Sequence, residues 1–183
     1  MKKQFIAKLL VLAMVLSMVP VTILAAGAAT AGNRNYGYYS VADDTTVKGA
    51  VASDGVIEAE VSFGKATVVL STKAAESLAD LAKDGEIVVE IKAEGADRID
   101  VSMPSKALTE VAKETGADLT IKSGVATITI PNTVLTNEFG VYGNVRITAQ
   151  ATESSVGFSI LTGGKALKNI AGLKVEFYSN HQK

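Results

Sequence analysis

Apolar and polar residues alternate along most of the chain after about residue 55, and this feature restricts its fold more than any other. In 86–92, EIVVEIK, Ile87, Val89 and Ile91 are apolar at every second position. Because successive side chains of a strand point to opposite faces, the pattern predicts strands with one apolar face, as in antiparallel sheets with one side in water. We expect strands at 56–63, 66–70, 86–92, 98–103, 118–122, 125–130, 144–150, 156–161 and 173–178.

Three segments interrupt the alternation, because their apolar residues recur at helical spacing. We expect helices in 71–85, 104–116 and 131–143, with only about one turn in the third, where β-branched residues disfavour a helix. Each segment begins with a residue that can cap a helix, and the first two close on glycine. The capping residues are Ser71 or Thr72, Ser105 and Asn132, and the glycines are Gly85 and Gly116.

The second and third helical segments share their punctuation. Pro104 and Pro131 are about 27 residues apart, and so are Leu108 and Leu135. We interpret this as duplicated strand–helix–strand units within one α+β domain, because a single unit cannot bury the apolar faces of both its strands and its helix. The predicted fold is a mainly antiparallel β-sheet with two or three short helices packed on one face.

The core of that domain is predicted from the apolar face of each element. It comprises Ile57, Val61, Leu78, Val89, Ile99, Val101, Leu108, Val111, Leu119, Ile121, Ile128, Ile130, Val145, Ile147, Phe158, Ile160, Val175 and Phe177.

The N-terminus has the layout of a secretory signal peptide. Lys2, Lys3 and Lys8 precede an apolar run of about 16 residues, and small residues follow it. The run is shorter than the roughly 20 residues that span a bilayer, so we expect membrane contact only before cleavage. The predicted organisation is a signal peptide in 1–28, an irregular Gly/Asn/Tyr lead-in in 29–48 and one α+β module in 49–183.

Composition excludes several functional classes. Without the three N-terminal lysines, 15 of the 18 Lys+Arg remain against 19 Asp+Glu, a net charge of about −4 with no basic stripe, which argues against nucleic acid. The chain has no Cys, so it has no disulfides, and one His, which is too few ligands for a zinc site. That residue, His181, lies three positions from the end, where we expect no catalytic role. We predict no enzyme activity, no cofactor and no metal.

A few residues remain as weaker candidates for chemistry. Glu58 and Glu60 share a strand face and could form a glycosidase pair, although solvated strand carboxylates are commoner. Acidic residues in loops or beside a turn could bind calcium, but none follows the Ca²⁺-loop pattern, and solvated turns are the preferred interpretation. They are Asp43, Asp44, Asp54, Glu94, Asp97 and Asp100. Tyr36, Tyr38 and Tyr39 could stack on sugar rings or bind a partner, although a linker is the commoner role of such a stretch.

Two stretches resemble a known class of protein. They are MPSKALTEVAKETGADLTIKSGVATITIPNTVL and VRITAQATESSVGFSILTGGKALKNIAGLKVEFY. They are similar to an extracellular repeat module of Gram-positive surface proteins that also carry S-layer homology domains, and the likeness covers about residues 49–178. The S-layer homology repeats themselves do not occur in this sequence. The resemblance implies a spacer or presentation module and brings no catalytic residues.

Together these features predict a non-enzymatic exported module of a bacterial cell surface, acting as a spacer or interaction domain. The alternative is a carbohydrate-binding or adhesive domain that uses the open face of the sheet or the tyrosine stretch. A hydrolase is a third, weaker alternative. The expected location is extracellular, in association with the cell surface, and the expected partners are cell-wall polysaccharide or other surface proteins.

Overall fold

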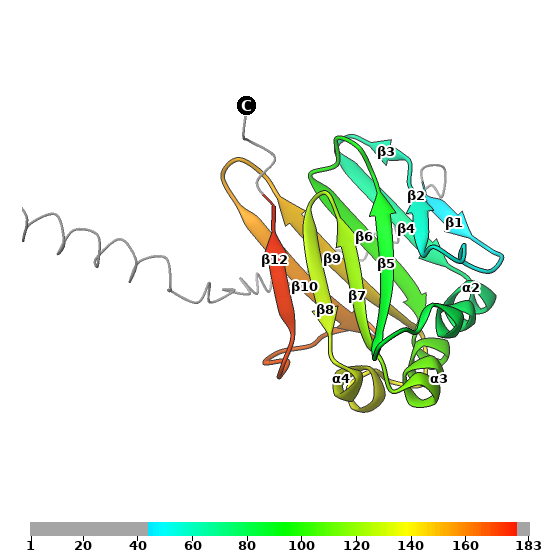
Figure 1. Cartoon of the computed structure of the whole chain (residues 1–183). Coiled ribbons are helices and arrows are strands. Elements are labelled where there is room, and N and C mark those ends of the chain that lie inside the picture. The colour runs from blue at the N-terminus through cyan, green and yellow to red at the C-terminus, as the bar shows by residue number, and fades with distance from the viewer. Residues whose placement is uncertain (1–43, 179–183) are drawn as a thin grey trace, which may run out of the picture. The chain divides into compact units, whose positions relative to one another are not determined.

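The computed structural model describes residues 44–178, which form two β-sheets and four short helical segments (Figure 1). Sheet A has the strand order β1-β4-β6-β9-β10-β11, and β3 pairs with β4 outside this path. Its strands are β1 (Thr45–Val47), β3 (Val61–Ser62), β4 (Lys65–Leu70), β6 (Arg98–Pro104), β9 (Asn144–Ala151), β10 (Val156–Thr162) and β11 (Lys165–Ala166). Sheet B has the order β12-β8-β7-β5-β2. Its strands are β2 (Val56–Glu58), β5 (Glu86–Lys92), β7 (Asp118–Ser123), β8 (Ala126–Ile130) and β12 (Lys174–Phe177).

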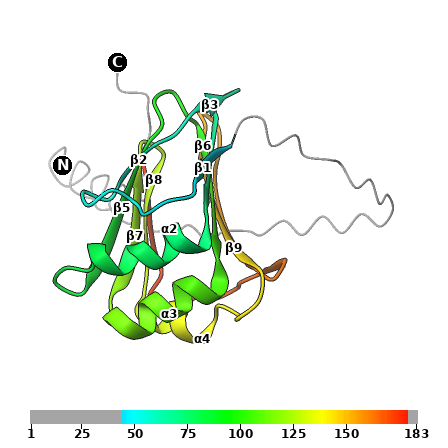
Figure 2. The same cartoon turned by 90° about the vertical axis from the view of Figure 1, so that its right-hand side faces the viewer.

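The two sheets face each other across one apolar interior (Figure 2). The alternation seen in the sequence becomes alternating burial: in β9, Val145, Ile147 and Ala149 are buried and their neighbours point outward. All 18 predicted core residues belong to this cluster, although Val61, Phe158, Val175 and Phe177 are only partly buried. Both sheets turn their polar faces outward, so binding chemistry on the sheets is confined to these outer faces.

Strand directions are mixed in both sheets. The pairs β1/β4, β2/β5, β4/β6 and β5/β7 are parallel, whereas β3/β4, β6/β9, β7/β8, β9/β10, β10/β11 and β8/β12 are antiparallel. Helical crossings separate the strands of three parallel pairs, β2/β5, β4/β6 and β5/β7, whereas no helix lies between β1 and β4. The chain leaves β4 through helices, enters β5 in the other sheet, and turns back into β6, which therefore runs beside β4 in the same direction. Periodicity reports which face of a strand is buried and carries no information on its direction.

The helices lie across the gap between the two sheets, not on one face as predicted, with α3 and α4 at one end and α2 nearer the middle of the gap (Figures 1 and 2). They are α2 (Thr72–Glu76), the 3₁₀ helix η2 (Ser77–Leu81), α3 (Ser105–Thr115) and α4 (Asn132–Asn137). Each connection carries the chain from one sheet to the other, from β4 to β5, β6 to β7, and β8 to β9. A helix that joins two layers must lie where the strands end, which explains its position.

Polar side chains fix these helices to one another. Ser71 caps α2, as expected, by accepting a hydrogen bond from the Ala74 amide. Ser105 is not the cap of α3, since Pro104 holds that position, and its hydroxyl donates to the Gly140 carbonyl instead. Asn132 likewise lies inside α4, where its side-chain amide donates to the Ala112 carbonyl at 2.6 Å. The helical end is therefore held by tertiary contacts as well as by local caps.

The described residues also show two differences near the start of the module. Strand β1 lies within 29–48, the segment predicted to be irregular, and it pairs in parallel with β4. The predicted strand 56–63 is divided between β2 in sheet B and β3 in sheet A. The chain thus crosses between the sheets here too, at the end away from the helices.

Candidate functional site: a trough on the outer face of sheet A

A trough runs along the outer face of sheet A, with β6 as its floor and β3, β4 and β9 beside it. Strand register explains why these side chains share one face. Lys65 pairs with Arg98, Thr67 with Asp100, and Ser102 with Arg146, so alternate residues of three neighbouring strands point outward together. The lining residues are Asp44, Ser62, Phe63, Lys65, Thr67, Val69, Asp100, Ser102, Asn144 and Arg146.

Asp100 lies at the centre of the trough floor and is only 6% exposed, although it belongs to an outer face. Arg98 grips the carboxylate from two positions along the same strand, with Nε 3.0 Å from Oδ1 and Nη2 3.0 Å from Oδ2. Lys65 approaches from β4, with its Nζ 3.1 Å from Oδ2. A two-pronged contact of this kind holds an arginine in one geometry, so the charges of the floor are fixed in place.

These contacts also decide the protonation of Asp100. Burial by itself raises the pKa of the carboxyl, but hydrogen bonds from Arg98, Thr148 and Lys65, together with the charge of Arg98, outweigh it. The net pKa of Asp100 is lowered, so the group stays ionised at neutral pH. A general acid needs a raised pKa, and Asp100 is instead suited to hold cations and accept hydrogen bonds.

Arg146 differs from the other two cations of this face. It is exposed on β9, and among residues 44–178 no acidic side chain forms an ion pair with it. Its guanidinium therefore offers its donors to solvent or to a ligand. Ser102 lies directly opposite on β6, and Asn144 precedes it on β9, so hydrogen-bonding groups surround it.

Phe63 stands at the margin of the trough with its side chain fully in solvent, at 102% relative exposure. It occupies the first position of a two-residue hairpin turn, because Ser62 pairs with Lys65 on either side of Phe63 and Gly64. Both turn residues have positive φ, 50° for Phe63 and 73° for Gly64. Such turns favour Asn-Gly or Asp-Gly, and a bulky residue there is an outlier. Phe63 therefore lies outside β3, although the predicted strand 56–63 included it.

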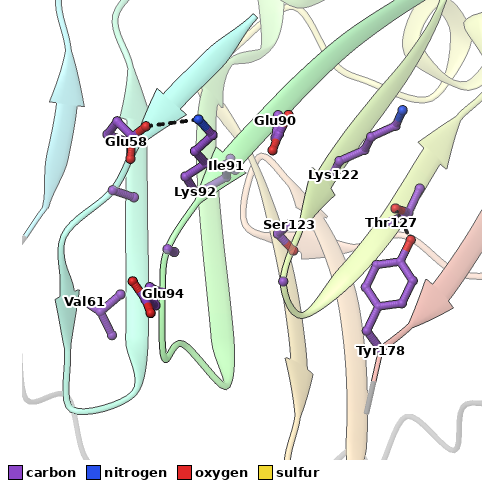
Figure 3. Close-up of a pocket in the computed structure, with 13 residues that line it drawn as sticks. Glu58, Val61, Glu90, Ile91, Lys92, Glu94, Lys122, Ser123, Thr127 and Tyr178 are labelled. Atoms are coloured by element: carbon purple, nitrogen blue, oxygen red, sulfur yellow. Dashed lines mark hydrogen bonds and ion pairs between the residues drawn. The ribbon is translucent and has the colours of Figure 1, made fainter. Parts of the chain in front are cut away.

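A second hollow lies over the outer face of sheet B and is more open (Figure 3). Glu58 pairs with Lys92 at 3.5 Å, and Thr127 shares a 2.7 Å hydrogen bond with the Tyr178 hydroxyl. The side chains of the ion pair are 75% and 53% exposed, so water screens it strongly. Glu58 and Glu60 are not on one strand, since β2 ends at Glu58 and β3 begins at Val61. This hollow lacks the fixed, buried floor of the trough.

Several residues singled out in the sequence lie outside the described part of the chain. They are Tyr36, Tyr38, Tyr39, Asp43 and His181, together with the signal peptide 1–28. Within 44–178, no three His, Cys, Asp or Glu side chains lie close enough together to hold a metal ion. No helix in that range is long and apolar enough to cross a membrane. Of the acidic candidates, Asp100 and Asp44 reach the trough.

Comparisons with protein-family models, curated proteins and solved structures find no match to this chain. The proposed function therefore rests on the geometry of the trough. Sequence reasoning missed Phe63, Lys65 and Arg146, because the pairing of β4, β6 and β9 brings them together from distant parts of the chain. One signal was present: Phe63-Gly64 stands between two alternating runs, where a hairpin turn prefers Asn-Gly.

Proposed function

We propose that this chain is an exported, non-enzymatic module of a bacterial cell surface that acts as an interaction domain. The N-terminal charge and apolar pattern supports export, and the likeness of 49–178 to surface-protein repeat modules supports the location. The proposal rests on the trough. Arg98, Lys65 and Thr148 hold the Asp100 carboxylate at its centre in the ionised form, which suits binding and not proton transfer.

A carbohydrate ligand is the second candidate function, and Phe63 favours it. Proteins bind sugars with an exposed aromatic ring beside side chains that exchange hydrogen bonds with hydroxyl groups. Phe63 lies at the trough margin, next to Lys65 and Ser62. Its ring is fully exposed, and its positive φ is unfavourable for a bulky residue. Such an outlier is a reason to infer function at its position.

A pull-down on insoluble cell-wall polysaccharide tests both candidates. The chain secreted by an expressing host is mixed with purified walls, and bound protein is measured before and after the wall polysaccharide is removed chemically. Retention that depends on the polysaccharide supports carbohydrate binding. Retention that survives removal of the polysaccharide supports a protein partner. No retention on either material would contradict the proposal that the chain binds cell-wall polysaccharide or surface proteins.

We also propose that β4–α2–η2–β5 and β6–α3–β7 are two copies of one strand–helix–strand unit. Their strands support this, because β4 pairs in parallel with β6, and β5 with β7, at nearly the same offset. Lys65 lies opposite Arg98 in sheet A, and Glu86 lies opposite Asp118 in sheet B. In both sheets, therefore, the paired residues are separated along the chain by about the length of one unit. Moving the first unit sideways by one strand spacing places it on the second.

A further inference from the structure

We infer that the trough binds an anionic glycan, an extended polysaccharide bearing carboxylate or phosphate groups, along the floor formed by β6. This inference rests on the proposed carbohydrate-binding function and adds the class of ligand. It depends on three features of the face: its charge, the distance between its cations, and the exposed ring at its margin.

The charge of this face differs from that of the chain as a whole. Lys65 and Arg146 line the trough against Asp100 and, at the edge, Asp44, and Arg98, which pairs with Asp100 from the same face of β6, adds a third cation. These five groups carry one net positive charge in an otherwise acidic chain, which favours anions at this surface. The outer face of sheet B has the reverse balance: its carboxylates are Glu58, Glu86, Glu90, Asp118 and Glu176, and its cations are Lys92, Lys122 and Lys174.

Arg146 is the group that can bind a new anion. The charge of Asp100 already occupies Arg98 and Lys65, whereas Arg146 has no ion-pair partner among the described residues. A planar guanidinium donates two parallel hydrogen bonds to a carboxylate or phosphate, which makes it the strongest anion ligand that a side chain offers. The adjacent Asn144 and Ser102 can bind neutral hydroxyl groups of the same sugar.

The distance between Phe63 and Arg146 along the strands favours a chain ligand over a single small anion. Lys65 lies in the row of Arg98, and Arg146 lies in the row of Ser102, so four residues of β6 separate the two rows. At about 3.3 Å per residue, the backbones of these rows are roughly 13 Å apart, although the Lys65 ammonium reaches toward Asp100 between them. A ligand that binds Arg146 and also contacts Phe63, at the Lys65 end, must be several units long.

The test compares binding of the secreted full chain to soluble polymers by isothermal titration calorimetry. The probes are polygalacturonate, poly(glycerol phosphate), neutral dextran and poly-glutamate. We expect binding to the first two, little binding to dextran or poly-glutamate, and at least about tenfold weaker binding when salt rises from 0.1 to 1 M, since screening shortens to about 3 Å. Polygalacturonate against poly(glycerol phosphate) identifies which anionic group the trough prefers.

Variants locate the site. Arg146→Gln is expected to weaken binding by about tenfold, the usual size of a lost charged hydrogen bond. Phe63→Ala weakens binding to the same polymers. Lys122→Gln is the matched control, because it removes one exposed cation from the outer face of sheet B and leaves the trough intact. Equal effects of Arg146→Gln and Lys122→Gln would overturn the inference.

The outcomes separate the inference from the function on which it rests. Equal binding to dextran and polygalacturonate overturns the anionic class and keeps a carbohydrate function. Binding to no glycan at all overturns both. Binding to poly-glutamate as tight as to polygalacturonate makes the trough a general anion surface and overturns a glycan as its ligand. Self-association that sedimentation detects and that Arg146→Gln abolishes would assign the trough to a second copy of the chain.

Discussion

Phe63 contributes little to the stability of the fold. Its ring buries no surface, and its left-handed backbone costs about 1–2 kcal/mol relative to an ordinary conformation. Stability alone would select Asn or Gly at this turn. We therefore propose that Phe63 serves a contact outside the chain, at the margin of the proposed site.

Replacing Phe63 with Asn tests this separation of stability from function. Phe63→Asn creates the preferred Asn-Gly turn, so we expect the free energy of unfolding to rise by roughly 1 kcal/mol, while glycan binding weakens. Chemical denaturation and the binding assay measure the two effects. Asp84→Asn is the control, because Asp84-Gly85 forms a similar turn with φ of 53° and 81°, and both side chains tolerate it. A less stable Phe63→Asn variant would show that the ring supports the fold.

Asp100 gives the chain a specific dependence on acid. Because the pKa of Asp100 is lowered on folding, the unfolded state binds its proton more readily between the ordinary value of 3.8 and the folded value. The stabilisation is therefore complete above about pH 5 and is lost as the pH falls through the folded pKa.

Asp100→Asn should remove this dependence. At pH 7 the variant should lose about 1–3 kcal/mol of unfolding free energy, as expected when charged hydrogen bonds are lost. The difference from the wild type should shrink as the pH falls below 4. Asp80→Asn is the control, since Asp80 is exposed and has no ion-pair partner in the described chain. A difference that stays constant from pH 7 to pH 2 would rule out the charge as its source.

At the level of elements, the strands and helices were largely predictable, but their arrangement was not. Period-two burial located β5, β6, β7 and β9 within a residue or two, because one face of each strand must be apolar. The parallel pairing of β4 with β6 and of β5 with β7, and the division of 56–63 between two sheets, depend on contacts far along the chain. The same limit applies to the trough, whose residues meet only through register.

Gly116 ends α3, as its position after the helical segment predicted. Its φ is 67°, and its amide donates to the Ala112 carbonyl at 3.0 Å, which is a left-handed helix end. Gly116→Ala should lower the free energy of unfolding by about 1 kcal/mol, from backbone strain alone, because an added Cβ meets no atom within 4 Å. Gly124→Ala is the matched control: its Cβ is equally unobstructed and its φ is not positive. Thermal unfolding of both variants checks this, and equal losses would contradict it.

At the scale of the described module, residues 44–178, one apolar interior leaves two outer faces with different chemistry. Core residues such as Ile147 and Ile121 come from opposite sheets and belong to the same cluster, so the sheets stabilise each other. The outer face of sheet A carries the positive trough, and that of sheet B carries an excess of carboxylates. The two outer faces of the module therefore differ in charge, and the proposed anionic ligand belongs to the face of sheet A.

Mapping the binding surface by nuclear magnetic resonance tests this account most directly. The uniformly ¹⁵N-labelled full chain is titrated with short polygalacturonate, and amide shifts are followed residue by residue. The account predicts saturable shifts at Phe63, Lys65, Asp100, Ser102 and Arg146, with β5, β7 and β8 unchanged. Shifts confined to sheet B, or no shifts in the trough at saturating ligand, would contradict it.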